Sequence, residues 1–160
     1  MTKGGIPTDE ITNMEKYGNY KEQMDRLKKA MDNHFLLEAV FIEYAIMEDR
    51  CESLLRHSGV FNPKKHNMIS KKLKSLEDLT GNNASLIRKY ISAELLQQIS
   101  AWKDERNRLI HALMKQSLTS EEIEALAEQG REIVKTLCSK ATSYKRALER
   151  AQKRMEEQVK

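Results

Sequence analysis

The sequence predicts an all-α protein, an antiparallel bundle of four to five helices with a long C-terminal helix. Only two prolines and six glycines occur in 160 residues, and strong helix formers fill the long stretches between them. Apolar side chains also recur every three or four residues through most of the chain. A chain of this length suits one domain, which we place at residues 20–160.

The N-terminal part of the chain carries two different patterns. Residues 1–19 hold three glycines and one proline without a sustained apolar period, which predicts a mobile arm. Residues 21–57 can be helical throughout, although a break near Asp32-Asn33 fits the pattern equally well. We expect this segment to end at Ser58-Gly59, where glycine can adopt the left-handed conformation that closes a helix.

The middle of the chain predicts three further helical segments. Asn62-Pro63 suggests a capping residue followed by a proline in the first turn, so we expect a helix from residue 63 to about Thr80. Gly81 and the two asparagines after it indicate a turn. A short helix at about 84–91 and a longer one at about 93–115 should follow.

The last predicted helix is the longest. Thr119-Ser120-Glu121-Glu122 has the form of a capping box, and a heptad seam from Ile123 to Met155 continues to about Gln158. Such a helix is roughly 55 to 60 Å long, against roughly 35 Å for residues 93–115. Residues 138–160 should therefore project from the bundle. The projection would bind a helix of a second copy or of another protein, or remain a frayed, solvated tail.

Composition limits the location and the chemistry. No run of about 18 apolar residues could span a bilayer, and the N-terminus lacks the apolar core of a signal peptide, so we expect a cytoplasmic protein without membrane contact. Cys51 and Cys138 match no paired spacing, and we expect buried thiols. Because P-loop, dinucleotide-binding and zinc motifs are absent from the sequence, we expect neither cofactor nor metal. The net charge of +4 permits a nucleic-acid partner.

Arg106 occupies an unusual position on its predicted helix. On a helical wheel it lies in the middle of an apolar face, with Asn107 about 100° and His111 about 140° away. One interpretation is a structural ion pair with Glu43, a carboxylate on an apolar face of the first helix that also carries Arg50 seven residues later. In that interpretation His111 is an ordinary histidine at the border of the face. The apolar neighbours of Arg106 are Ile99, Trp102, Leu109, Ile110 and Leu113.

The segment Arg106-Asn107-Arg108-Leu109-Ile110-His111 also resembles a known active-site motif. Its R-N-x-x-x-H pattern, on the penultimate long helix of a small bundle, is similar to the signature of the HEPN family of ribonucleases. The resemblance implies metal-independent cleavage of single-stranded RNA, in which the ribose 2′-hydroxyl attacks the phosphate and leaves a 2′,3′-cyclic product. It also implies a role as a toxin or phage-defence effector.

The resemblance assigns a role to each residue of the motif. His111 would transfer a proton near neutral pH, and Arg106 would stabilise the charge that develops on the phosphorane oxygens. Asn107 would orient His111 or bind phosphate. Because Arg106 and His111 point about 140° apart, and one histidine must serve two proton transfers, we expect a homodimer with a composite site, as is common in the family.

Two further features bear on substrate and regulation. Some HEPN toxins carry a tyrosine two residues after the histidine that a partner enzyme modifies, but this chain has Leu113 there, so inhibition by a protein partner would need another route. RNA contacts are expected from the basic residues near the site, or these form an ordinary solvated face. They are Lys103 and Arg108 beside the motif, and Lys64, Lys65, His66, Lys71, Lys72 and Lys74 at the start of the second predicted helix, where the N-terminal amides would also favour phosphate.

A second function remains open from the sequence. HEPN-like domains without catalytic activity exist, and this chain would then be a helical module that binds RNA or a protein through its last helix. Arg106 separates the two hypotheses. A cleft active site requires an arginine at the centre of an apolar face, whereas a binding module gains little from it.

Overall fold

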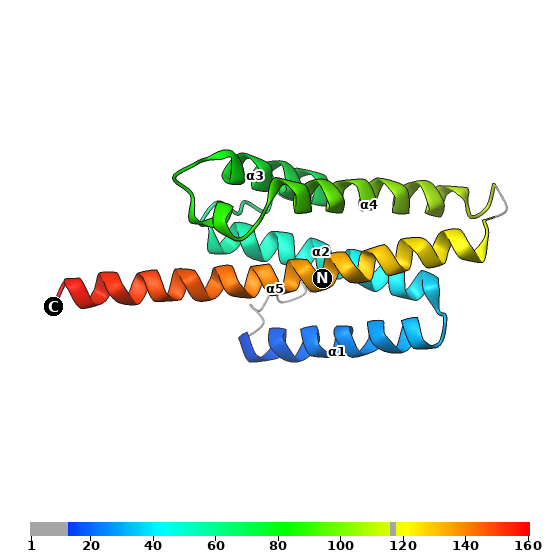
Figure 1. Ribbon diagram of the computed structural model, residues 1–160, viewed down its shortest axis with the longest axis horizontal. Helices are drawn as coiled ribbons and strands as arrows, with labels where there is room; N and C mark the ends of the chain where they lie inside the picture. The colour runs from blue at the N-terminus through cyan, green and yellow to red at the C-terminus, as the bar shows by residue number, and fades with distance from the viewer. Residues whose placement is uncertain (1–12, 116–117) are drawn as a thin grey trace, which may run out of the picture.

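The computed structural model describes residues 13–115 and 118–160, and these form five α-helices and a short 3₁₀ helix without any strand (Figure 1). The predicted all-α fold with a long C-terminal helix is confirmed. The elements are α1 (Asn13–Asp32), α2 (Leu36–His57), α3 (Ile69–Gly81), η1 (Leu86–Lys89), α4 (Ala93–Ala112) and α5 (Ser120–Gln158).

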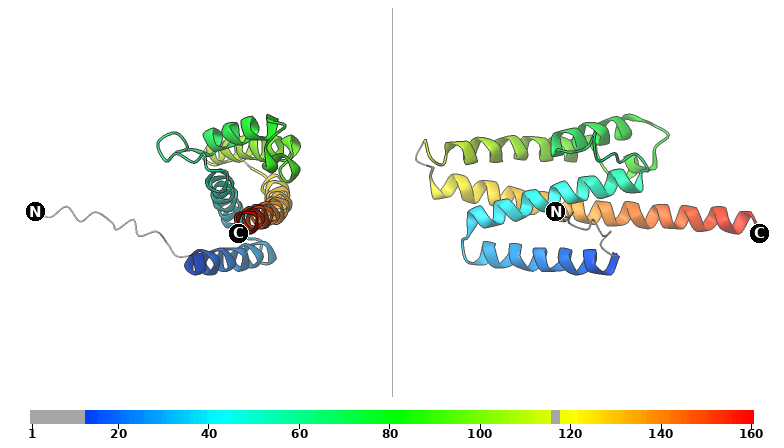
Figure 2. Two further views of the ribbon diagram at one scale, coloured as in Figure 1. Left: turned by 90° about the vertical axis from the view of Figure 1, so that its left-hand side faces the viewer. Right: turned by 180° about the vertical axis from the view of Figure 1, so that it is seen from behind.

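Helix α2 is the centre of the bundle and packs against α1, α3, α4 and α5. Viewed along the bundle, α2 and α5 lie between α1 on one side and α3 with α4 on the other (Figure 2). The core between them is formed by large, fully buried side chains. The indole N–H of Trp102 donates to the backbone carbonyl of Leu126 at 2.9 Å, which fixes α4 against α5.

The predicted helix 21–57 is two helices. α1 begins at Asn13, so residues 13–19 are helical where we expected a mobile arm, while residues 1–12 lie outside the described part of the chain. His34 has a φ of 57°, a left-handed conformation that ends α1, and the amide of Phe35 donates to the carbonyl of Ala30 at 2.8 Å. α1 therefore folds back along α2, and the predicted break falls at residues 33–35.

The second predicted helix begins six residues later than expected. Asn62 does cap a turn, because its side-chain oxygen accepts from the amides of Lys64 and Lys65 at 3.0 and 3.4 Å, but α3 itself starts at Ile69. His66 holds this turn by bonding the Asn62 amide at 2.9 Å and the Ser75 hydroxyl at 2.8 Å. The Asn62-Pro63 pattern therefore marks a turn and not the start of α3. The predicted short helix at 84–91 is the 3₁₀ helix η1, and α4 ends at Ala112.

Helix α5 begins as predicted and extends beyond the other helices. Thr119 and Glu122 form the expected capping box, and at 39 residues the helix is about 58 Å long. Its packed part reaches further than expected, because Ala141, Tyr144 and Ala147 are buried. The Tyr144 hydroxyl also lies 2.8 Å from the Ser58 hydroxyl. The end that projects in Figure 1 therefore begins after about residue 148 rather than at residue 138.

Candidate functional site

Arg106 lies on α4 with its guanidinium against an aromatic ring of α2. The guanidinium carbon is 4.0 Å from the centre of the Tyr44 ring, and Nη1 donates to the side-chain oxygen of Asn107 at 3.0 Å. The Nε–H is buried without a hydrogen-bond partner. The residue as a whole is only half-buried. The cation is thus held by a flat aromatic surface and remains partly open to solvent.

Glu43 is not the partner of Arg106. Its side chain is completely buried, and neither carboxyl oxygen has a hydrogen-bond partner among the described residues. A Cβ built on Gly130 of α5 would lie 2.6 Å from Glu43 Oε1, so the carboxyl packs directly against the α5 backbone. The pKa of Glu43 is raised to about 9, mainly by burial and also by the nearby negative charge of Glu128, with Arg131 opposing the change. The ion pair that the sequence suggested is therefore wrong.

Arg50 is also engaged away from Arg106. Its guanidinium bonds the carboxylate of Asp49 and lies 5.0 Å from the centre of the Tyr20 ring on α1. It therefore lies where α2 meets α1, and the structure does not bring it together with Arg106.

His111 is exposed in the last turn of α4, one turn after Asn107. The Asn107 side-chain oxygen accepts from Arg106 and not from His111. Asn107 thus orients the arginine, while the imidazole makes no hydrogen bond or ion pair with a described residue and is exposed to a ligand or a second molecule. Of the two roles expected for Asn107, the orientation of His111 is not present in this geometry.

Apolar side chains surround this constellation on the protein surface. Leu37 and Phe41 of α2 are 49% and 69% exposed, and Ile110 of α4 and Leu113 are each 39% exposed. Leu37, Ile110 and Leu113 line a small hollow together with Arg106 and residues of α5, and Phe41 lies one helical turn after Leu37 on α2. We call Leu37, Phe41, Ile110 and Leu113 the α2–α4 face. Sequence reasoning missed it, although the nearly continuous apolar character of residues 35–47 was its signal.

The expected RNA-contacting residues fall into an exposed group and a group that is buried or engaged in ion pairs. Lys64, Lys65, Lys71 and Lys74 are exposed. Lys72 is buried in ion pairs with Glu48 and Glu52 at 3.1 and 3.8 Å, and Lys103 pairs with Asp104 at 3.2 Å.

The remaining two basic residues are also engaged. Arg108 bonds Glu105 at 2.6 Å, which raises the pKa of Arg108 and lowers that of Glu105. His66 is buried in its turn, and burial lowers its pKa. Lys72 and His66 therefore serve the fold. The start of α3 also lies beyond Lys64 and Lys65, so its N-terminal amides do not support a phosphate site at these residues.

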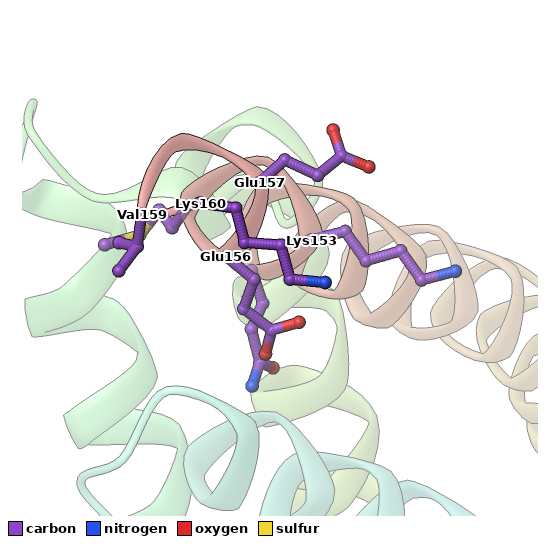
Figure 3. Close-up of a pocket in the computed structure, with 7 residues that line it drawn as sticks. Lys153, Glu156, Glu157, Val159 and Lys160 are labelled. Carbon is purple, nitrogen blue, oxygen red and sulfur yellow. The ribbon is translucent and has the colours of Figure 1, made fainter.

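A hollow of about 800 Å³ lies at the C-terminal end of α5 (Figure 3). Its lining comes only from residues 152–160, all exposed, and the labelled side chains point in different directions. No group of polar atoms converges there. Within residues 13–115 and 118–160, no cluster of three or more histidine, cysteine or acidic side chains could hold a metal ion, and no helix has the length and apolarity to cross a bilayer.

Comparisons of the chain with protein-family models, with curated proteins and with solved structures found no match. The assignment of a function therefore depends on the residues and their geometry.

Proposed function

We propose that this protein is a homodimeric, metal-independent endoribonuclease of the HEPN type, with Arg106, Asn107 and His111 in its site. The observation that carries the proposal is the environment of the Arg106 guanidinium. Its guanidinium lies on a helix face that is otherwise apolar, yet it is partly exposed, unpaired with any carboxylate of the described residues, and held by Tyr44 and Asn107. A purely structural arginine would be expected to pair with a buried carboxylate.

The proposed chemistry needs only groups that this chain supplies. The 2′-oxygen of a ribose attacks the adjacent phosphorus, the bond from phosphorus to the 5′-oxygen breaks, and a 2′,3′-cyclic phosphate and a 5′-hydroxyl result. One His111 accepts the proton of the 2′-hydroxyl, and a second His111 donates a proton to the departing 5′-oxygen. Arg106 stabilises the extra negative charge on the phosphorane oxygens, which a preorganised guanidinium does well in a partly desolvated site.

The α2–α4 face supports a second copy as the source of the second histidine. It is apolar, it lies beside Arg106, and its side chains remain exposed in one copy. A two-fold axis through this face would place two copies of α4 side by side, with both His111 residues bordering one cleft. Burial of Phe41, its most exposed residue, would be worth about 2 kcal/mol in each copy.

The test is cleavage of a mixed single-stranded RNA in EDTA by the purified protein, with identification of the product ends. We expect 2′,3′-cyclic phosphate ends from wild type, and a loss of about 10² to 10⁴ in rate for His111→Ala, the range typical of a general acid or base. Arg106→Ala should lose activity similarly. Arg88→Ala is the matched control, because Arg88 is an exposed arginine on η1 with no expected part in the site.

The same preparations test the dimer. Phe41→Glu should lower the molar mass measured by light scattering to that of one chain and should reduce cleavage with it. Unchanged cleavage by His111→Ala, or no cleavage by wild type of any RNA tried, would contradict the proposal. The latter outcome favours the non-catalytic binding module.

A further inference from the structure

A second, separate groove lies where α1, the C-terminal half of α2 and the middle of α5 meet. Its volume is about 460 Å³, within the range of small-molecule sites in proteins. Five cationic side chains and one carboxylate, that of Glu149, line it, together with two tyrosines and His57. The cations are Lys16, Arg50, Arg56, Lys145 and Arg146.

The positive charge of this groove is only partly neutralised by the protein. Asp49 pairs with Lys16 at 3.5 Å and with Arg50, and Glu52 pairs with Arg56 at 3.6 Å. Lys145 and Arg146 form no ion pair with any described residue, and Glu149 is the only carboxylate left in the lining. The groove therefore keeps an excess of positive charge where three helices meet.

The pKa of His57 indicates that several of these cations lie close to the same point in the groove. Its pKa is lowered, first by partial burial and then by the positive charges of Lys145, Lys16 and Arg50, with Glu149 opposing. These three cations come from three different helices. The negative end of the α2 dipole would explain Arg56 and His57 in its last turn, but not Lys16, Lys145 or Arg146 on α1 and α5.

The carbonyl groups at the end of α2 also need no cation. The amides of Ser58, Gly59 and Val60 donate to the carbonyls of Leu54, Arg56 and Leu55 at 3.0 to 3.1 Å. The helix end is thus closed by its own backbone. Neither an ion pair with a described residue nor the carbonyls at the end of α2 therefore accounts for Lys145 and Arg146.

Of the two tyrosines in the lining, one is covered by the protein and the other is exposed. Tyr20 is covered by Arg50, whereas Tyr17 is 70% exposed and makes no ring contact among the described residues. An exposed ring beside unpaired cations suits a ligand that joins a flat base to a phosphate, because bases stack on aromatic side chains and phosphates bind lysine and arginine.

We propose that the groove between α1, α2 and α5 binds a nucleotide, with Lys145, Arg146 and His57 on its phosphate and Tyr17 on its base. The nucleotide is either free or part of a single-stranded RNA. The proposal does not depend on the ribonuclease site, because the lining shares no residue with Arg106, Asn107, His111 or the α2–α4 face.

The experiment measures binding of adenosine 5′-monophosphate by calorimetry and of a fluorescent ten-nucleotide RNA by anisotropy. The RNA is offered to the His111→Ala protein, so that cleavage cannot be mistaken for weak binding. We expect Lys145→Glu to weaken binding about tenfold, since it replaces an attractive charge by a repulsive one at the phosphate. Lys140→Glu, an exposed residue on the same helix outside the groove, makes the same change in net charge and should alter binding less than twofold.

The outcomes separate the sources of the phosphate. Binding of both probes, each weakened by Lys145→Glu alone, assigns the groove to a nucleotide that can stand free. Binding of the RNA only, with the same dependence on Lys145, assigns it to a nucleotide within a chain. Equal effects of the two charge reversals, or no binding of either probe at millimolar concentration, would overturn the proposal. A protein that binds the probes in this way but does not cleave RNA would contradict the ribonuclease proposal and would still support the nucleotide groove.

Discussion

Glu43 and Arg106 each place an ionisable group on an apolar helix face, yet the bundle treats them differently. Glu43 is fully enclosed between α2 and α5, without a hydrogen-bond partner for either oxygen among the described residues. Arg106 lies at the edge between α2 and α4, where Tyr44 covers one face of the guanidinium and Nε is buried, while part of the side chain stays open to solvent. A carboxyl can lose its charge by binding a proton, whereas a guanidinium keeps its charge and must stay near water or a partner.

The comparison separates a group that costs stability from one that is available for function. Burial keeps Glu43 protonated and neutral at pH 7, and this lowers the free energy of unfolding. Arg106 keeps a charge that a phosphate could use.

Replacing Glu43 by glutamine should stabilise the protein. The folded state holds the Glu43 proton up to a pKa of about 9, whereas the unfolded chain releases it near the usual 4.5. At pH 7 this difference costs about 3 kcal/mol of folding free energy, since each pKa unit corresponds to about 1.4 kcal/mol. Glu43→Gln should recover most of it, measured by urea denaturation followed by circular dichroism at a fixed protein concentration.

The same residue predicts how stability depends on pH. Between pH 4.5 and 9 the folded protein binds one more proton at Glu43 than the unfolded chain does, so raising the pH should lower the free energy of unfolding. The slope that Glu43 contributes should disappear in Glu43→Gln and remain in Glu38→Gln, an exposed carboxylate on the same helix. A wild-type protein as stable as Glu43→Gln at every pH would show that the carboxyl has found a partner.

The effect of Gly130→Ala on the free energy of unfolding should change sign with the residue at position 43. In wild type the new Cβ would meet the Glu43 carboxyl at 2.6 to 2.7 Å, and such overpacking costs about 1–3 kcal/mol, against about 1 kcal/mol gained from helix propensity. In a Glu43→Ala background the contact is gone, and Gly130→Ala should stabilise by up to about 1 kcal/mol. Urea denaturation of the four proteins measures this. Destabilisation in both backgrounds would mean that Gly130 is needed for a reason other than Glu43.

Much of the fold was predictable because its signals are local. The scarcity of proline and glycine, the three-to-four period and the capping box at Thr119 and Glu122 predicted the helices and the start of α5. The Asn62-Pro63 signal failed because a turn and a helix start use the same capping chemistry. His66 and its contacts with Asn62 and Ser75 continue the turn to residue 68, and no period reveals that.

The site was predictable only in part. Its position on an apolar face singled out Arg106, but its partner depends on how α2 is rotated about its own axis. Glu43 and Tyr44 are neighbours in sequence and lie 100° apart on that helix, so a small rotation decides which of them meets α4. In the bundle Tyr44 faces Arg106 and Glu43 faces Gly130 of α5. That choice is set by the packing of all the helices on α2.

The smallest effect provides the most direct test of this arrangement. Double-mutant cycles with Arg106→Met and Tyr44→Leu should give a coupling of about 0.5–1 kcal/mol between Arg106 and Tyr44, as expected for a partly exposed cation on an aromatic ring. Arg106→Met combined with Glu43→Gln should be additive within about 0.5 kcal/mol, because the two groups share no contact. Coupling to Glu43 in place of Tyr44 would restore the ion pair and turn Arg106 into a structural residue, and the main support for a ribonuclease site would be lost with it.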